Sequence, residues 1–335
     1  MAVYTVLSPA EIADALARFG LPPPERVVPE PRGYVNTNHH VWAGGARWFL
    51  RVAEGKTEAD VRFEGEVHAF LARAGFPAPR LVAAADGRPF ASAGGRLVML
   101  FAYAPGEELA EDAVTPERCR TVGDRLARLH ELSEGFTADR PNPFGPARVA
   151  SWIAEIRRDA AADAEVARAL PLLEDESRRA AALPGAPRGL VHGDLFVDNV
   201  LWIGDRPSAV LDWEMACVDA FAWDLGVALC AWAWGDGAFD GARAAALLRG
   251  YAARRPLDPG TARALAPYAR LAALRFAASR ILALRAPDPG RDRAPRKDWR
   301  PFRDRLAALA ALGDEGLAAL AGVGRGADRG PTGPR

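Results

Sequence analysis

The stretch from residue 190 to residue 214 limits what this chain can fold into more than any other, because it spaces three oxygen-bearing side chains between short apolar runs. Asp194 and Asn199 follow one strand-like apolar segment, and Asp212 follows the next. Because Asn199 comes only five residues after Asp194, both side chains can point into one cleft from a single loop. The fold must therefore bring a carboxylate, an amide and a second carboxylate together.

This set of side chains suits phosphoryl transfer to an alcohol. Its order and spacing parallel the catalytic loop and the metal-binding acid of protein kinases. We predict that Asp194 orients the acceptor hydroxyl toward the γ-phosphate, and that Asn199 and Asp212 bind Mg²⁺, which prefers sparse oxygen ligation by protein. The chain is therefore predicted to be an Mg²⁺-dependent phosphotransferase of a small-molecule alcohol, with ATP as the expected co-substrate and GTP left open.

Two other interpretations of the same residues are weaker. Each acid alone could be a turn residue that accepts backbone amide hydrogen bonds, but their combination between apolar strands argues against this. A metallophosphoesterase would need several histidine ligands. The chain has five histidines, and none follows His192. We therefore exclude the hydrolase and assign His192 itself a supporting role in the loop.

Composition excludes several other classes. The chain of 335 residues holds 43 Lys and Arg against 43 Asp and Glu, so no net field favours nucleic acid or an anionic membrane. The N-terminal residues lack the pattern of a signal peptide, and no apolar stretch reaches the roughly 18–20 residues of a membrane span. The three cysteines are far apart, which fits a reducing compartment. A cytoplasmic location is expected, and the oligomeric state is left open.

The first part of the chain is predicted to form a small strand-rich lobe, residues 1–105. A capping box at Ser8 predicts a helix that ends at Gly20, and a proline-rich connector follows over residues 22–31. Residues 39–43 and 46–52 predict a hairpin, residues 57–74 a helix, and residues 96–103 a strongly apolar last strand. Two more strand-like segments flank Asp86-Gly87. This part is expected to bind the nucleotide.

The remainder, residues 106–321, is predicted to form a larger and mainly helical lobe that carries the catalytic and acceptor-binding residues. Its first helix begins at Thr115-Pro116. Residues 322–335 are rich in Gly, Pro and Arg, and they are predicted to be a disordered tail. The expected fold class is α+β: two lobes as in protein kinases, with a small antiparallel sheet in the N-terminal lobe.

The small lobe offers candidate ligands for the nucleotide. Arg51 stands where a kinase carries its phosphate-binding lysine, and it needs a carboxylate on the following helix. Glu64 is the first choice and Glu66 the second, because helical phase alone does not separate them. Asn36 and Asn38 lie in the segment that takes the place of a phosphate-binding loop, although a plain turn explains this segment equally well.

Several motifs resemble those of the aminoglycoside phosphotransferase and choline kinase superfamily. They are VHGDLFVDNVLW, VLDWEMACVDAFAWDLG and LARLH, with the resemblance running from Tyr34 to about Leu312. The resemblance implies a bilobal kinase-like fold. It also implies that Asp224 supports the catalytic segment without touching substrate.

Within that superfamily the chain is most similar to type II homoserine kinases, on GYVNTNHHVW, RLAALRFAASRIL and RKDWRPFRDRL. The resemblance implies L-homoserine as the acceptor. It departs at residues 230–232, where Cys-Ala-Trp replaces a common Asn-Asp-Trp, and this departure bears on the acceptor. Arg275 and Arg280 are candidates to bind the homoserine carboxylate, with a salt bridge inside the lobe as the alternative. An aminoglycoside or choline-type kinase and a catalytically silent nucleotide-binding protein remain the other hypotheses.

Overall fold

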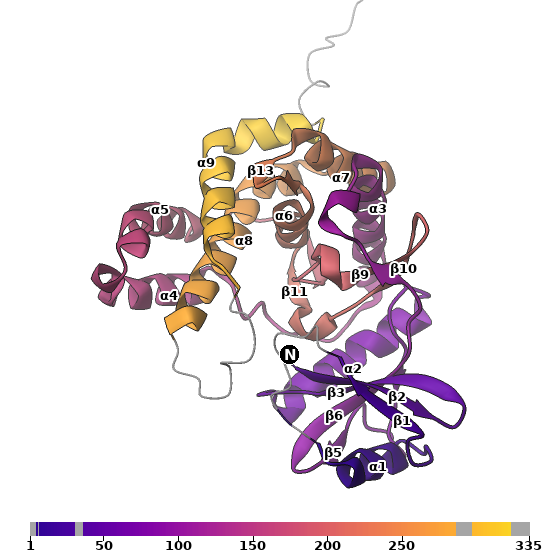
Figure 1. Ribbon diagram of the computed structural model, residues 1–335. Coiled ribbons are helices and arrows are strands. Elements are labelled where there is room, and N and C mark those ends of the chain that lie inside the picture. The colour runs from indigo at the N-terminus through magenta and orange to yellow at the C-terminus, as the bar shows by residue number, and fades with distance from the viewer. Residues whose placement is uncertain (1–4, 6, 31–35, 286–296, 323–335) are drawn as a thin grey trace, which may run out of the picture.

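A sheet lobe and a helical lobe lie next to each other in the computed structural model, which describes residues 5, 7–30, 36–285 and 297–322 (Figure 1). The first lobe contains α1 (Pro9–Arg18), β1 (Arg26–Pro29), β2 (Thr37–Ala43), β3 (Ala46–Val52), α2 (Glu58–Arg73), β4 (Leu81–Val82), β5 (Ala91–Ala93) and β6 (Arg96–Ala102). Its strands pair antiparallel in the order β1-β2-β3-β6-β4, with β5 also on β6. The predicted α+β arrangement with a small antiparallel sheet is confirmed.

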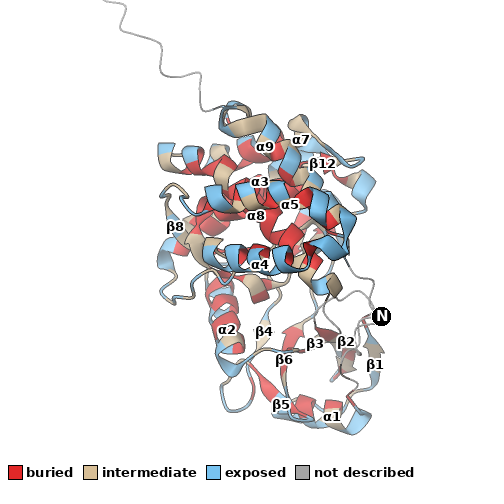
Figure 2. Cartoon of the chain, turned by 90° about the vertical axis from the view of Figure 1, so that its left-hand side faces the viewer, coloured by how far each residue is buried: buried red, intermediate tan, exposed pale blue. Residues whose placement is uncertain are grey.

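The second lobe is mainly helical. Its helices are α3 (Pro116–Leu132), α4 (Pro146–Arg158), α5 (Ala164–Ala180), α6 (Phe221–Trp232), α7 (Gly241–Arg254), α8 (Pro259–Arg285) and α9 (Arg300–Leu320). Its short strands are β7 (Glu107–Glu108), β8 (Arg188–Val191), β9 (Val200–Ile203), β10 (Arg206–Val210), β11 (Cys217–Ala220), β12 (Trp234–Gly235) and β13 (Ala238–Phe239). Figure 2 shows α8 as a largely buried helix inside this lobe.

The two faces of the small sheet bury different side chains. Successive residues of a strand point to opposite faces, and in β2 every second residue is buried. Val41 of β2 and Leu50 of β3 pack with Leu16 of α1 in one apolar cluster. On the other face, Met99 of β6 packs with Val61 of α2. Since Arg51 is opposite Met99 in the β3–β6 register, its side chain lies on the α2 face.

Helix α2 has a capping residue at each end of the predicted range, residues 57–74. Thr57 accepts a hydrogen bond from the Asp60 amide as the N-cap of α2, and Ala74 is the C-cap. The capping box at Ser8 is present in α1, and α3 begins at Pro116 with Thr115 as its N-cap. Local capping chemistry therefore gives the helix ends correctly.

The strands depart from expectation in several places. The predicted proline-rich connector contains β1, which pairs with β2 at the edge of the sheet, where Pro29 is tolerated. β9 was not predicted. The two strand-like segments on either side of Asp86-Gly87 are strands as predicted, and both pair with β6. The predicted disordered tail, apart from Gly322, lies outside the described residues, as do residues 33–35 of the segment that was predicted to take the place of a phosphate-binding loop.

Close backbone contact joins α3 to α7. A Cβ atom on Gly123 of α3 would lie 2.0 Å from the carbonyl oxygen of Leu247 in α7, so only glycine allows this approach. The contact brings His130, near the end of α3, beside Tyr251 of α7. None of the helices in the described parts of the chain has the length and apolarity to cross a membrane.

Candidate active site

A buried carboxylate on α6 accepts hydrogen bonds from the loop that carries Asp194. Asp224 of α6 is fully buried and accepts hydrogen bonds from the backbone amides of His192 and Gly193, each at 2.7 Å. Gly193 has φ +77°, and a Cβ there would lie 2.9 Å from the carbonyl oxygen of Met215. The loop therefore needs glycine at this position and takes its shape from Asp224.

Asp224 has a further partner in His130. The His130 Nε2 atom lies 3.2 Å from Asp224, and its Nδ1 atom lies 2.8 Å from the Tyr251 hydroxyl. Burial raises the pKa of Asp224, but hydrogen bonding and the charge of His130 outweigh burial and hold that pKa below its usual value. Asp224 is thus an ionised, internal support for the loop, as the family resemblance implies.

His192 also acts inside the protein. It is fully buried, and its Nε2 atom lies 2.8 Å from the carbonyl oxygen of Leu211, the residue before Asp212. The contact fixes the loop of Asp194 to the segment that carries Asp212. This position supports the two acids without exposing the imidazole to the cleft.

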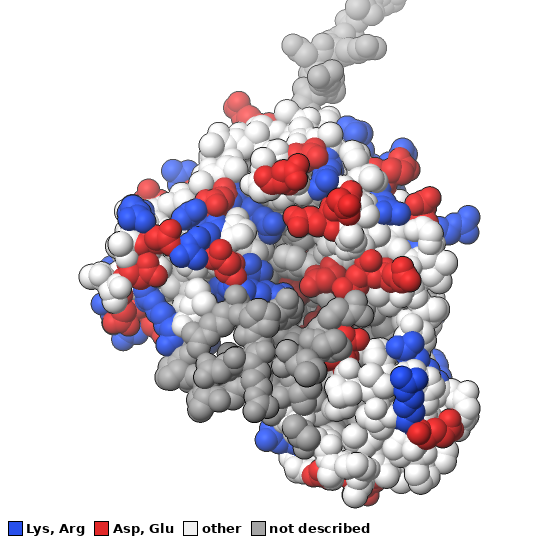
Figure 3. All heavy atoms as spheres, in the orientation of Figure 1, with Lys and Arg blue, Asp and Glu red and all other residues white. Residues whose placement is uncertain are grey.

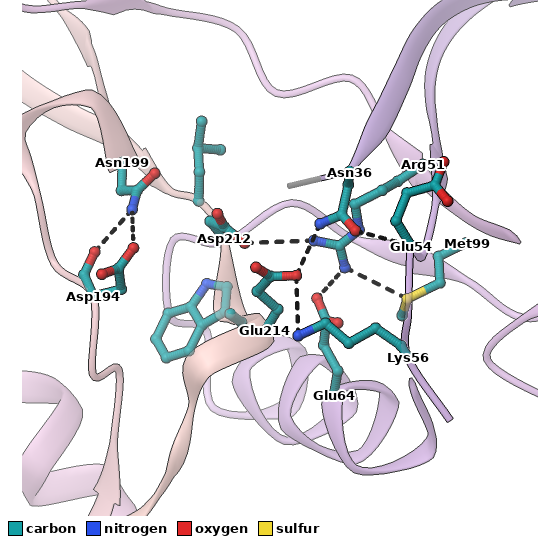
Figure 4. Close-up of polar contacts among 12 residues, drawn as sticks. Asn36, Arg51, Glu54, Lys56, Glu64, Met99, Asp194, Asn199, Asp212 and Glu214 are labelled. Atoms are coloured by element: carbon teal, nitrogen blue, oxygen red, sulfur yellow. Dashed lines mark hydrogen bonds and ion pairs between the residues drawn. The ribbon is translucent and has the colours of Figure 1, made fainter. Parts of the chain in front are cut away.

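Asp194 and Asn199 lie together in the large-lobe wall of the cleft (Figure 4). The Asn199 amide nitrogen donates to the Asp194 carbonyl oxygen at 2.8 Å and lies 3.4 Å from its carboxylate. Burial raises the pKa of Asp194, and the positive charges of Arg275 and Lys297 oppose that shift. A raised pKa makes this carboxylate a better proton acceptor once it is ionised.

Asp212 faces the small lobe from the same wall. Its backbone is left-handed, with φ 56° and ψ 67°, a conformation that Asp tolerates better than most residues. One carboxylate oxygen lies 3.6 Å from a guanidinium nitrogen of Arg51. Burial, together with the nearby Glu214 carboxylate, raises the pKa of Asp212 well above its usual value, while Arg51 opposes the shift.

Arg51 and Glu64 form a buried ion pair on the small-lobe wall. A second contact, at 3.4 Å, joins Arg51 to the sulfur of Met99. Burial alone would raise the pKa of Glu64, but the charge of Arg51 prevails and lowers it to about 2. Glu66 is exposed on the opposite side of α2. Of the two candidate acids, Glu64 is the one that contacts Arg51.

A buried hydrogen bond crosses between the lobes at Asn36. Its side-chain nitrogen donates to Glu214 at 2.8 Å, and its side-chain oxygen accepts from the Glu54 amide at 3.1 Å. The ammonium group of Lys56 lies 3.4 Å from the same Glu214 carboxylate. Glu214 and Lys56 were not predicted. The acid two residues after Asp212 was the only signal in the sequence.

Asn38 is placed differently from Asn36. It is opposite Arg51 in the β2–β3 register, and its buried side-chain oxygen has no hydrogen-bond partner within the described residues. His39 and His40 are β2 residues, as predicted. The structure therefore places Asn36 in the lobe-to-lobe contact and Asn38 outside it, with its buried oxygen unpartnered among the described residues.

The two predicted acceptor arginines lie beside the catalytic loop. The Arg275 guanidinium carbon is 4.1 Å from the ring centre of Phe144 and 4.0 Å from that of Phe276. Arg280 lies over Phe302 at 4.3 Å and donates to the Asp298 carbonyl at 2.7 Å. Neither arginine forms an ion pair within the described parts of the chain. Figure 3 shows basic and acidic side chains on either side of the hollow at the centre of this face.

The oxygens of the large-lobe wall suit a hard divalent cation. One Asp212 carboxylate oxygen is buried without a hydrogen-bond partner among the described residues. Asn199 supplies an uncharged oxygen, since its amide nitrogen already donates to Asp194. A carboxylate and an amide oxygen are the sparse donor set that Mg²⁺ prefers. The described residues contain no cluster of three His, Cys, Asp or Glu side chains with metal-binding geometry.

Two lobes around a cleft, with a carboxylate-bearing loop facing a buried arginine–glutamate pair, define a kinase-like phosphotransferase. A family model described as "Phosphotransferase enzyme family" matches residues 26–257. The chain belongs to this family.

Relatives with assigned names extend the comparison. The chain is 33% identical to the homoserine kinase of Azorhizobium caulinodans over 327 residues, which cover 95% of this chain and 100% of that one. It is 34% identical to the homoserine kinase of Methylorubrum populi over 292 residues, covering 84% and 88% of the two chains.

Solved structures share the fold at low identity. Amicoumacin kinase hAmiN superposes with a TM-score of 0.63 at 16% identity, covering 88% of this chain and 89% of that one. A microcompartment-associated aminopropanol kinase gives 0.59 at 19% identity, with 93% and 98% covered. These likenesses bear on the fold alone, and they confirm the kinase-like α+β architecture.

Proposed function

We propose that this protein transfers the γ-phosphate of ATP, with Mg²⁺, to the side-chain hydroxyl of L-homoserine. The observation that carries the proposal is the convergence of Asp194, Asn199 and Asp212 on one wall of the cleft, opposite the Arg51–Glu64 pair (Figure 4). In phosphoryl transfer, positioning and charge neutralisation supply most of the rate enhancement. Both walls offer the groups that these two tasks need.

Asp194 is the proposed base for the acceptor hydroxyl. Its carboxylate is held by the loop that Asp224 anchors, so it can orient the hydroxyl with little loss of entropy on binding. As the hydroxyl oxygen bonds to the γ-phosphorus, the bond from that phosphorus to the β–γ bridging oxygen breaks and ADP leaves, while the hydroxyl proton passes to the Asp194 carboxylate. The raised pKa of Asp194 favours this transfer.

Asn199 and Asp212 are the proposed ligands of Mg²⁺. When bound, the cation would neutralise negative charge on the phosphate oxygens. Asp212 must be ionised to serve, and a nearby divalent cation reverses the upward pKa shift that burial and Glu214 cause. The geometry keeps Asn199 in reach because its amide nitrogen is tied to the Asp194 carbonyl.

Arg51, Asn36 and Asn38 are the proposed nucleotide-side residues. Glu64 fixes the Arg51 guanidinium and keeps it charged, so that it can direct parallel hydrogen bonds at phosphate oxygens. The side-chain oxygen of Asn38, which has no hydrogen-bond partner within the described residues, is a further proposed acceptor on this wall. Asn36 acts indirectly by holding the two lobes together through Glu214.

Homoserine as the acceptor is supported by relatives over nearly the full chain. The homoserine kinase of Azorhizobium caulinodans aligns with 95% of this sequence, including both lobes. The positive side chains near Asp194 also suit an acceptor that carries a carboxylate better than a polycation. An aminoglycoside would instead require acids close to the reacting hydroxyl.

The test is ADP release measured with homoserine, choline, ethanolamine and an aminoglycoside, each with ATP and Mg²⁺. We expect homoserine to give the largest kcat/KM, with O-phosphohomoserine as the product in mass spectrometry. Stimulation by another alcohol alone would refute homoserine while keeping the phosphotransferase. If no alcohol in the panel stimulates ADP release, the result would support the silent nucleotide-binding protein.

A further inference from the structure

Arg275 is a buried cation that lacks an anionic partner in the described structure. It is only 6% exposed, and its guanidinium lies between the rings of Phe144 and Phe276. Its Nε atom is buried without a hydrogen bond, and no described residue forms an ion pair with it. Buried charges are costly unless they are paired and hydrogen-bonded. An arginine in this state needs an explanation outside the resting fold.

The other buried arginines of the described chain are compensated. Arg51 is paired with Glu64. Arg270, five residues before Arg275 in the same helix, lies 3.0 Å from Glu176 and 2.7 Å from Asp314. Two neighbouring helices, α5 and α9, therefore supply anionic partners for Arg270, whereas Arg275 has no ion pair among the described residues.

The position of Arg275 relates it to the reacting group. Phe276 contacts Phe196 of the catalytic loop with ring centres 4.9 Å apart, and Phe196 is two residues after Asp194. Arg275 and Asp194 are near enough that each charge stabilises the ionised form of the other. A group bound to Arg275 would therefore lie beside the carboxylate that receives the hydroxyl.

We propose that Arg275 binds the carboxylate of the acceptor and restricts the enzyme to alcohols that carry one. This inference rests on the proposed function and deepens it. The guanidinium can form two parallel hydrogen bonds to a carboxylate, and the rings on either side exclude water from that contact. Arg280, over the Phe302 ring that packs on Phe276, adds a second positive charge to the same region.

The first measurement compares acceptors that differ only in the carboxylate. With wild type we expect L-homoserine to have a KM about 10–150-fold lower than homoserinol, in which a hydroxymethyl group replaces the carboxylate. Arg275→Met should raise the KM for homoserine by a similar factor and leave the KM for ATP unchanged. The variant should use homoserine and homoserinol almost equally.

Arg270 supplies the matched control. Arg275→Lys and Arg270→Lys both keep the charge and remove the fork of the guanidinium, and only Arg275→Lys should raise the KM for homoserine. In thermal melts without substrate, Arg270→Met should lower Tm because it leaves Glu176 and Asp314 without their cation. Arg275→Met should keep or raise Tm, since it removes a charge that has no partner in the resting state.

The outcomes are distinct. An unchanged homoserine KM in Arg275→Met overturns the inference, and so does a wild type that prefers homoserinol. A fall in Tm that matches Arg270→Met, with the KM for both ATP and homoserine raised, overturns it in favour of a structural role. If wild type ignores homoserine but uses another carboxylate-bearing alcohol, homoserine is refuted, and loss of that preference in Arg275→Met supports Arg275.

Discussion

The two walls of the cleft each contain a buried arginine, and the two arginines differ in whether they form an ion pair. On the small-lobe wall, Arg51 is paired with Glu64 and is held in place before any ligand arrives. On the large-lobe wall, Arg275 lies between aromatic rings with no ion pair in the described residues. A paired cation has a fixed position, whereas an unpaired one gains stability only with its ligand. On the function proposed above, the wall that would bind the nucleotide has its ion pair before any ligand arrives, and the wall that would bind the acceptor gains its anion from the substrate.

The largest expected effect concerns the acid of the acceptor wall. Asp194→Asn should lower kcat by roughly 10²–10⁴, the range for loss of a positioned general base, and should leave nucleotide affinity nearly unchanged. Steady-state kinetics and nucleotide titration measure the two quantities separately. Asp198→Asn, at an exposed site in the same loop, is the control. Near-wild-type turnover in Asp194→Asn would contradict the assignment of the base.

A substitution at Asp212, which faces Arg51 of the small lobe, tests the proposed metal site. Asp212→Asn keeps a residue that tolerates the left-handed backbone but removes the negative charge. We expect the Mg²⁺-dependent gain in nucleotide affinity to fall by more than roughly 10–100-fold, which is the loss typical when a residue that only hydrogen-bonds to a metal ligand is replaced. Titrations with Mg²⁺ and with a chelator measure that gain. An equal gain in wild type and variant would remove Asp212 from the metal site.

A substitution at Glu64 tests whether its ion pair with Arg51 stabilises the small lobe in the absence of ligand. Glu64→Gln leaves the buried charge of Arg51 uncompensated, and we expect it to lower the free energy of unfolding by about 3 kcal/mol at neutral pH. Glu66→Gln, at an exposed position in the same helix, should change that free energy by less than about 0.5 kcal/mol. Urea denaturation measures both values.

The pH dependence of that loss has a defined sign. The pKa of Glu64 is about 2 in the folded protein, lowered from an ordinary value of 4.5. The ion pair therefore stabilises the fold fully above about pH 4.5, and its contribution disappears as the pH falls toward 2. The difference between wild type and Glu64→Gln should shrink when urea denaturation is repeated at about pH 3. A constant difference would show that Glu64 acts through packing.

The smallest effect concerns the bond that joins the walls. Asn36→Ala removes the hydrogen bond to the buried Glu214 carboxylate and should cost about 2 kcal/mol of unfolding free energy, as for other bonds to charged groups. Asn38→Ala is the matched comparison, because its buried side-chain oxygen has no partner within the described residues. Equal destabilisation by the two substitutions would contradict the special role of Asn36.

Local patterns in the sequence predicted the elements that local chemistry controls. Capping residues gave the ends of α1 and α2, and the spacing of Asp194 and Asn199 gave one loop with both side chains in contact. The choice between Glu64 and Glu66 could not be made in this way. It depends on which face of α2 packs on the sheet, and that is a tertiary property.

Contacts between segments that are far apart in the chain could not be predicted from the sequence. Asn36 and Glu214 are 178 residues apart, so neither position indicates the other. β1 was missed in a proline-rich segment because Pro29 argues against a strand unless that strand lies at the edge of a sheet, and the position of β1 in the sheet is a tertiary property. The lack of an ion pair at Arg275 could not be predicted either, since the sequence does not show which arginines of α8 are reached by acids of other helices.

The left-handed backbone at Asp212 has a consequence for the history of this gene. A φ of 56° strains a residue with a Cβ, and glycine relieves that strain while asparagine tolerates it. Glycine and asparagine codons are each one base substitution away from an aspartate codon. In a lineage that no longer needs the reaction, drift at this codon should run toward those two residues. If Asp212 binds the metal as proposed, an aspartate that persists here is the sign of a gene copy still under selection for catalysis.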